Sequence, residues 1–187
     1  TSNFTGAIDD RWTGGTINGI FFLNNPINGL YYWNGDITTR LRKMPGSSVA
    51  PVCRAFRNYL VQINYRYVNW SSAAEPGSIP LYWTAAATND AGTQPLSETQ
   101  GVLVDCLPLG DVNIIYGRDS RYAMRWIEGN NVFAFQRLPG NDGVRAVSCV
   151  VDTPKGHVFL TQNLDVKIHS GGSCQSLAEG RVRTILN

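Results

Sequence analysis

Aromatic residues that stand beside polar turn residues are the feature of this sequence with the clearest chemical potential. A flat aromatic ring can cover the apolar C–H face of a sugar, while Asp, Asn and Arg side chains form oriented hydrogen bonds with its hydroxyl groups. Four segments combine the two, one of them at 9–12. The other three supply the candidate ligand-binding residues: Trp33, Asn34 and Asp36, then Trp83, Asn89 and Asp90, then Arg118, Asp119 and Arg121. The pattern predicts a carbohydrate site built from loops.

Each of these clusters also has a structural interpretation. Tryptophans of β-proteins pack in cores or across strands, and Asn, Asp and Gly form turns. Both interpretations stay open, with the 33–36 tip and the 116–122 turn ranked highest as ligand sites. A basic stretch at 40–43, followed by Arg54 and Arg57, is either a patch for acidic glycans or a solvated strand face.

Catalytic and metal-binding patterns are not found in the sequence. No G-x-S-x-G nucleophile elbow occurs, and the cysteines form no close C-x-x-C pair that would indicate a zinc site. Most acidic residues fall in predicted turns, where Asp caps backbone groups, and no calcium-loop motif is present. We therefore predict a binding protein rather than an enzyme, with no metal and no cofactor.

The four cysteines, Cys53, Cys106, Cys149 and Cys174, are widely spaced. An even number of separated cysteines is typical of disulfide bonds formed in an oxidising compartment, which predicts an extracellular or cell-surface protein. Three pairings are possible. The sequential pairs, Cys53–Cys106 and Cys149–Cys174, are the simplest of them.

Charge and hydropathy exclude two other classes of partner. The chain has 187 residues, 16% of them charged, and a formal net charge of only +2, so there is no broad electrostatic case for nucleic acid. No apolar run approaches the roughly 20 residues needed to span a membrane.

Short strand signals separated by Gly, Pro, Asn and Asp run through the whole chain, and helical periodicity is almost absent. They predict an all-β, antiparallel fold of roughly ten strands, a β-sandwich or a jelly roll. The segment 54–70 is predicted as the longest strand, and tight hairpins are expected at Asn34-Gly35 and Gly129-Asn130. No repeat of fixed period is visible, so the sequence does not favour a propeller.

The tail offers the one candidate domain boundary, at 170–173. Residues 171–187, "GGSCQSLAEGRVRTILN", resemble the start of the pilin domain in two-domain fimbrial tip adhesins of the chaperone–usher type. Gly171, Gly172 and Cys174 match the linker and its cysteine. The alternating residues of the first pilin strand correspond to Val182, Thr184 and Leu186.

This resemblance implies that residues 1–170 form a β-sandwich receptor-binding domain, usually a lectin, secreted to the periplasm. Residues 171–187 are then the start of a following domain; if Cys174 pairs with Cys149, they are instead the closing strand of the first. The implied partner is a host glycan or glycoprotein receptor, with other fimbrial subunits as further partners. Two alternatives are a viral attachment spike or capsid projection and a secreted jelly-roll hydrolase.

Overall fold

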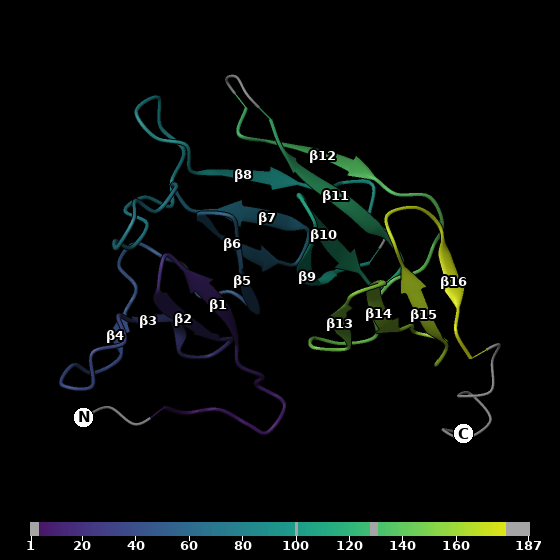
Figure 1. Ribbon diagram of the computed structural model, residues 1–187, viewed down its shortest axis with the longest axis horizontal. Helices are drawn as coiled ribbons and strands as arrows, with labels where there is room; N and C mark the ends of the chain where they lie inside the picture. The colour runs from purple at the N-terminus through teal and green to yellow at the C-terminus, as the bar shows by residue number, and fades with distance from the viewer. Residues whose placement is uncertain (1–3, 100, 128–130, 179–187) are drawn as a thin grey trace. The chain divides into compact units, whose positions relative to one another are not determined.

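The computed structural model describes residues 4–99, 101–127 and 131–178. These residues contain no helix and form sixteen strands in four antiparallel sheets of four strands each (Figure 1). The predicted all-β, antiparallel class is confirmed, and it is consistent with a β-sandwich. In each sheet, strands that are consecutive in the sequence are neighbours in space, so every sheet is a meander, and the described strands do not close into a barrel.

The chain divides into two compact units, residues 1–96 and 97–187. The first sheet of unit 1 contains β1 (Thr13–Ile17), β2 (Ile20–Asn25), β3 (Gly29–Trp33) and β4 (Arg42–Lys43). Its second sheet contains β5 (Val52–Phe56), β6 (Tyr59–Asn64), β7 (Tyr67–Trp70) and β8 (Gly92–Pro95). The first sheet of unit 2 contains β9 (Leu103–Leu109), β10 (Val112–Gly117), β11 (Arg121–Trp126) and β12 (Phe133–Arg137). Its second sheet contains β13 (Val150–Thr153), β14 (Gly156–Leu160), β15 (Val166–His169) and β16 (Cys174–Ser176).

The strands outnumber the prediction because several hairpin turns lack the usual glycine signal. The segment 54–70 is not one long strand: it turns at Arg57 and again at Tyr65, whose φ angles are 52° and 55°. A positive φ is uncommon for residues other than glycine, so neither turn was visible in the sequence. As a result one predicted strand becomes β5, β6 and β7.

The tight hairpin predicted at Asn34-Gly35 is not formed. Strand β3 pairs with β4 through Tyr32 and Arg42, which leaves an eight-residue connection at 34–41. The hairpin predicted at Gly129-Asn130 and the alternating residues Val182, Thr184 and Leu186 lie outside the described residues. The 170–173 segment connects two neighbouring strands, because β16 pairs with β15 in the last sheet.

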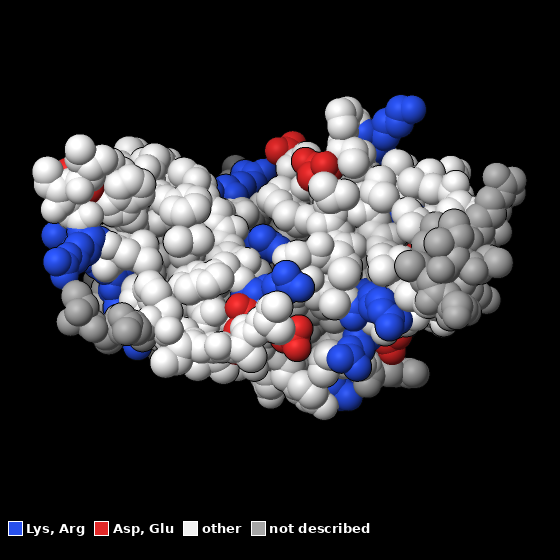
Figure 2. Space-filling model, turned by 90° about the horizontal axis from the view of Figure 1, so that it is seen from below, with Lys and Arg blue, Asp and Glu red and all other residues white. Residues whose placement is uncertain are grey.

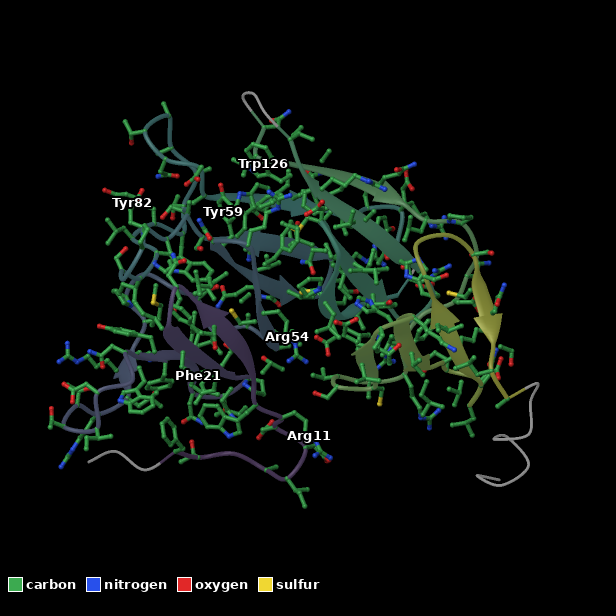
Figure 3. The ribbon with its side chains drawn as sticks, viewed as in Figure 1. Arg11, Phe21, Arg54, Tyr59, Tyr82 and Trp126 are labelled. Carbon is green, nitrogen blue, oxygen red and sulfur yellow. The ribbon has the colours of Figure 1, made fainter. Side chains whose placement is uncertain are left out.

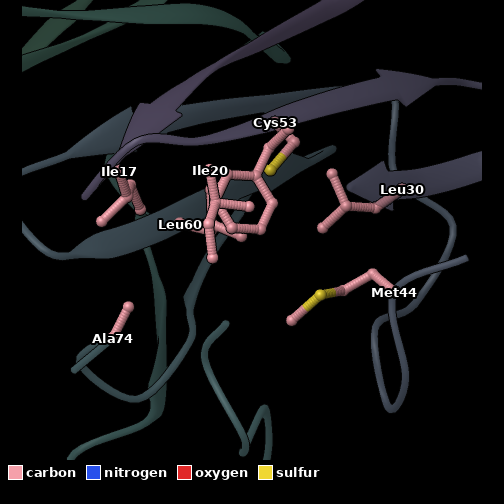
Figure 4. Packing of buried hydrophobic residues seen from close by; sticks show 8 residues of the cluster. Ile17, Ile20, Leu30, Met44, Cys53, Leu60 and Ala74 are labelled. Atoms are coloured by element: carbon pink, nitrogen blue, oxygen red, sulfur yellow. The ribbon is translucent and has the colours of Figure 1, made fainter. Parts of the chain in front are cut away.

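The core of unit 1 lies between its two sheets (Figure 4), where β1 packs against β5. Gly15 of β1 makes this approach possible: a Cβ atom there would lie 2.7 Å from the Cβ of Ala55 on β5. The cluster consists of Ile17, Ile20, Phe22, Leu30, Met44, Cys53, Leu60 and Ala74. Burial of these apolar side chains is the main stabilising contribution in this unit.

The core of unit 2 is built around Tyr116 and Phe159, whose ring centroids are 5.3 Å apart. Cys149 and Cys174 pack against its edge, yet no disulfide bond is seen among the described residues. The sheet order gives the reason. Cys149 immediately precedes β13 and Cys174 begins β16, at opposite edges of the same sheet, so three interstrand spacings, roughly 14 Å, separate these strands. A disulfide bond needs Cα atoms within about 7 Å.

Candidate functional site

Unit 1 contains a pocket of about 340 Å³ beside Trp83, here called the Trp83 pocket. It is lined by residues of β6, β7 and β8 and by residues of the loops 44–51 and 71–91. Its lining residues are Gly46, Ser48, Gln62, Asn69, Trp83, Thr84, Ala85, Gly92 and Thr93. None of the nine carries a charge.

The floor of the pocket is a row of three polar side chains on adjacent strands. Gln62 of β6 lies opposite Asn69 of β7, and Asn69 lies opposite Thr93 of β8. Residues directly opposite each other in an antiparallel pair point to the same face of the sheet, so the row is continuous. Gln62 is buried, Asn69 is half-buried and Thr93 is exposed, so the row runs from the core to solvent.

Hydrogen bonds hold this floor in place. The Gln62 side chain donates from Nε2 to the Ser48 carbonyl (2.9 Å) and accepts from the Ser48 hydroxyl (3.1 Å). The Thr93 hydroxyl donates to Oδ1 of Asn69. The oxygen of the Asn69 amide therefore already accepts one hydrogen bond, and its Nδ2 group can donate to a ligand in the pocket.

The aromatic wall is Trp83, which is half-buried and also packs against the core of unit 1. Its ring lies beside Gly46, where a Cβ atom would be 3.5 Å from Cδ1 of the indole. The indole Nε1 is buried and has no hydrogen-bond partner among the described residues, so a ligand oxygen reaches it only if the ring turns.

The loop that carries Trp83 is fixed at both ends. Asp90 accepts hydrogen bonds from the Tyr59 hydroxyl (2.8 Å; Tyr59 is labelled in Figure 3) and from the backbone N–H of Ala73 (3.0 Å). The Ser72 hydroxyl accepts from the backbone of Leu81 and of Tyr82, each at 3.2 Å. A wall held in this way needs little ordering when a ligand binds.

A second pocket, of about 210 Å³, lies in unit 2 and has a different character. Its charged lining residues are Arg118, Asp142, Asp165 and Lys167. Most of these charges already have partners: Lys167 Nζ lies 2.5 Å from Oδ1 of Asp142, and Asp165 accepts from the Ser176 hydroxyl at 2.8 Å. Two positive and two negative groups balance, which gives this pocket no preference for an ion of either sign.

The 33–36 tip that the sequence ranked highly lies in neither pocket. Trp33 donates from Nε1 to the Asp36 carbonyl (3.0 Å), and Asn34 accepts from the Thr39 hydroxyl (2.9 Å). The Asp36 carboxylate accepts from the hydroxyl and the N–H of Thr38, and these bonds lower its pKa below the usual value. The polar groups of the tip thus stabilise its own turn.

The other predicted residues are distributed among three roles. Trp83 lines the first pocket and Arg118 the second. Asn89 caps its own loop by accepting from the N–H of Ala91, and Asp90 anchors the loop as described above. Asp119 is half-buried, and Arg121 is only 1% exposed, where it donates to the carbonyls of Pro139 and Asp142.

The sequence analysis missed Gln62, Asn69 and Thr93 as site residues. Gln62 and Thr93 are 31 positions apart along the chain, and the three residues have no motif in common. Only the register of β6, β7 and β8 places them in one row. The alternation of polar and apolar residues over 59–67 is the available signal, and it includes only Gln62 of the three.

Charge is scattered over the surface. In the view of Figure 2, Lys and Arg lie in separate groups with Asp and Glu among them, and most of the face is uncharged. Among the described residues no group of three or more His, Cys, Asp or Glu side chains is placed to hold a metal ion, and no helix could cross a membrane.

No protein-family model matches the chain, and no curated protein matches it significantly in sequence.

Proposed function

We propose that this chain is a receptor-binding module that takes a neutral saccharide in the Trp83 pocket. The observation that carries the proposal is the pairing of an indole wall with a floor of amide and hydroxyl groups in a pocket whose nine lining residues are all uncharged. The indole covers the C–H face of a sugar ring, and Asn69 and Thr93 hydrogen-bond with its hydroxyl groups.

The absence of charge in this lining favours neutral over acidic glycans. A sialic acid carboxylate or a sulfate taken into the pocket loses hydration and finds no cation among the lining residues, which is costly. The same lining has no carboxylic acid, so the hydrolase alternative finds no acid–base pair there.

The test is a glycan array that contains neutral and acidic saccharides. We expect the wild-type chain to bind neutral members, and Asn69→Ala and Thr93→Val to weaken that binding by about tenfold each. Trp83→Ala should abolish it, but because Trp83 also supports the core, its circular dichroism must first match that of the wild type. Trp33→Ala is the matched control and should bind normally.

Three results would contradict the proposal. Loss of binding in Trp33→Ala with retention in Asn69→Ala places the site at the 33–36 tip. Binding restricted to sialylated or sulfated glycans overturns the neutral pocket. Binding of no glycan by the folded wild-type chain overturns carbohydrate recognition altogether.

The cysteines bear on which kind of larger protein, here called the carrier, contains this binding module. Among the described residues no disulfide bond is seen, and Cys53 and Cys106 are each fully buried, in unit 1 and unit 2 respectively. Reduced cysteines are typical of proteins that fold in the cytosol, and disulfide bonds are typical of the periplasm. The oxidation state of the cysteines in the native protein therefore separates the two carriers, the fimbrial adhesin and the viral attachment or capsid projection.

Non-reducing mass mapping of the protein from its native source decides between the two carriers. Four reduced cysteines support the viral projection. A Cys53–Cys106 bond supports a secreted adhesin. Neither result affects the saccharide proposal, which depends on unit 1 side chains alone.

A further inference from the structure

Unit 2 contains both histidines of the chain, and they form one buried pair. His157 on β14 lies directly opposite His169 on β15, and both side chains are 0% exposed. Arg121 on β11 is also buried, and its positive charge acts on His169. Three groups that are cations, or can become cations, are therefore close together in the interior of this unit.

Both ring nitrogens of His157 have hydrogen-bond partners. Its Nε2 lies 2.8 Å from the Pro108 carbonyl, and its Nδ1 lies 2.9 Å from the Tyr116 hydroxyl. Because a carbonyl can only accept, Nε2 carries a proton, and in the neutral ring Nδ1 accepts from the Tyr116 hydroxyl. Burial lowers the pKa of His157, while the Pro108 carbonyl and Asp152 oppose that shift.

His169 has no such partners. Neither of its ring nitrogens makes a hydrogen bond in the folded chain, so burial of a protonated ring would be poorly compensated. Burial first, then Arg121 and His157, lower its pKa to about 4, and only the backbone of Gly172 acts in the other direction.

The charged and titratable groups around the pair do not neutralise a second cation. They are Asp105 on β9, Tyr116 on β10, Arg121 on β11, Asp152 on β13 and Cys174 on β16. Asp105 accepts from the backbone of Cys106 and Ser148, and Asp142, nearby in a loop, is paired with Lys167. Asp152 is exposed and lies 3.8 Å from Nε2 of His157. Neither Arg121 nor His169 forms an ion pair with a described carboxylate.

We propose that the His157–His169 pair makes unit 2 acid-sensitive, so that mild acid loosens the β14–β15–β16 part of its last sheet while unit 1 stays folded. Cys174 lies opposite His169, so β16, an edge strand of only three residues, is the first element to open. Unit 1 contains neither histidine and serves as an internal control.

Because the pKa of His169 is lowered in the folded chain, acid destabilises the region around it. A histidine whose pKa is lowered in the folded state binds fewer protons there than in the unfolded state, so stability is full above the unfolded pKa of 6.5 and falls as the pH drops toward about 4. For His169 alone, the unfolding equilibrium constant of the surrounding region rises about 30-fold between about pH 7.5 and pH 5. The lowered pKa of His157 adds to this.

Hydrogen exchange of the full chain, corrected for intrinsic rates and followed by mass spectrometry, tests the proposal. Peptides from β14 to β16 should exchange about 30-fold faster at pH 5 than at pH 7.5. Peptides from β5 to β8 should not change. In His169→Gln the acid-induced increase in the exchange rate of these peptides should be about 30-fold smaller, because Gln does not titrate.

Equal exchange at the two pH values, or the full acid response in His169→Gln, overturns the proposal. If that variant does not fold, the ring carbon shifts of the two histidines in the folded wild-type chain replace it. A neutral His169 ring at pH 5 supports the proposal, and a ring that titrates near pH 6.5 without loss of structure overturns it.

Discussion

The hydroxyl of Tyr59 donates a 2.8 Å hydrogen bond to the carboxylate of Asp90, and this bond ties β6 to the loop that carries Trp83. Asp90 also accepts from the N–H of Ala73, and its backbone carbonyl accepts from the indole of Trp70 (2.9 Å). One residue at the end of the loop thus connects it to β6, to β7 and to its own beginning. The wall of the Trp83 pocket depends on this connection.

Removing the Asp90 carboxylate should destabilise unit 1. In Asp90→Ala the Tyr59 hydroxyl and the Ala73 N–H lose their acceptor, which costs about 1–3 kcal/mol for partly buried groups. Tyr59→Phe removes only one of the two bonds and should cost about 1 kcal/mol. Urea denaturation measures both values. Equal stability of Asp90→Ala and the wild type would show that the loop does not depend on this carboxylate.

Enlarging Gly15 should separate β1 from β5. The closest atom to a Cβ at this position is the Ala55 Cβ at 2.7 Å, so Gly15→Val overfills the contact and should cost about 1–3 kcal/mol. Gly172→Ala is the control, because a Cβ there meets nothing within 4 Å and its φ is not positive. Thermal unfolding of both variants checks the difference, and a Gly15→Val protein as stable as Gly172→Ala would contradict the packing.

Replacing Arg121 should alter both the stability of unit 2 and the titration of His169. Arg121→Met leaves the carbonyls of Pro139 and Asp142 without their donors, which should destabilise the loop at 139–142. It also removes a positive charge that lowers the pKa of His169, so that pKa should rise. Histidine ring shifts followed by NMR against pH report the change, and an unchanged or lower midpoint would contradict the proximity of these two groups.

The Cys174 thiol should react slowly. Burial is the main reason that its pKa is raised from 9.0 to about 11, and Asp142 adds to the shift, while Arg121 and Lys167 oppose it. The thiolate is the reactive form, so iodoacetamide near pH 8.5 should modify Cys174 about 100-fold more slowly than an ordinary thiol. Timed alkylation with peptide mass analysis measures this rate. Modification at the rate of a free thiol would show that Cys174 is neither buried nor shifted.

The fold class followed from local signals, but the number of strands did not. Asn18-Gly19 joins β1 to β2, inside the segment 16–24 that the strand pattern predicts as a single strand. The turns at Arg57 and Tyr65 have the same positive φ angles without glycine, and the packing of the sheets on either side compensates for their local strain. Likewise the four sheets begin at residues 13, 52, 103 and 150, at unequal spacings, so their shared meander architecture left no fixed period in the sequence.

By itself the sequence determined the class of this protein: frequent turn residues, alternating apolar positions and missing helical periodicity leave only antiparallel sheets as a way to satisfy the backbone. It also identified Trp83 as a binding candidate. Only the tertiary structure decided which polar residues accompany it, because the row of Gln62, Asn69 and Thr93 exists through strand register. Tertiary structure likewise set Cys149 and Cys174 at opposite edges of one sheet, and brought His157 opposite His169. Cross-strand neighbours are fixed by pairing and packing over the whole unit, which local sequence does not encode.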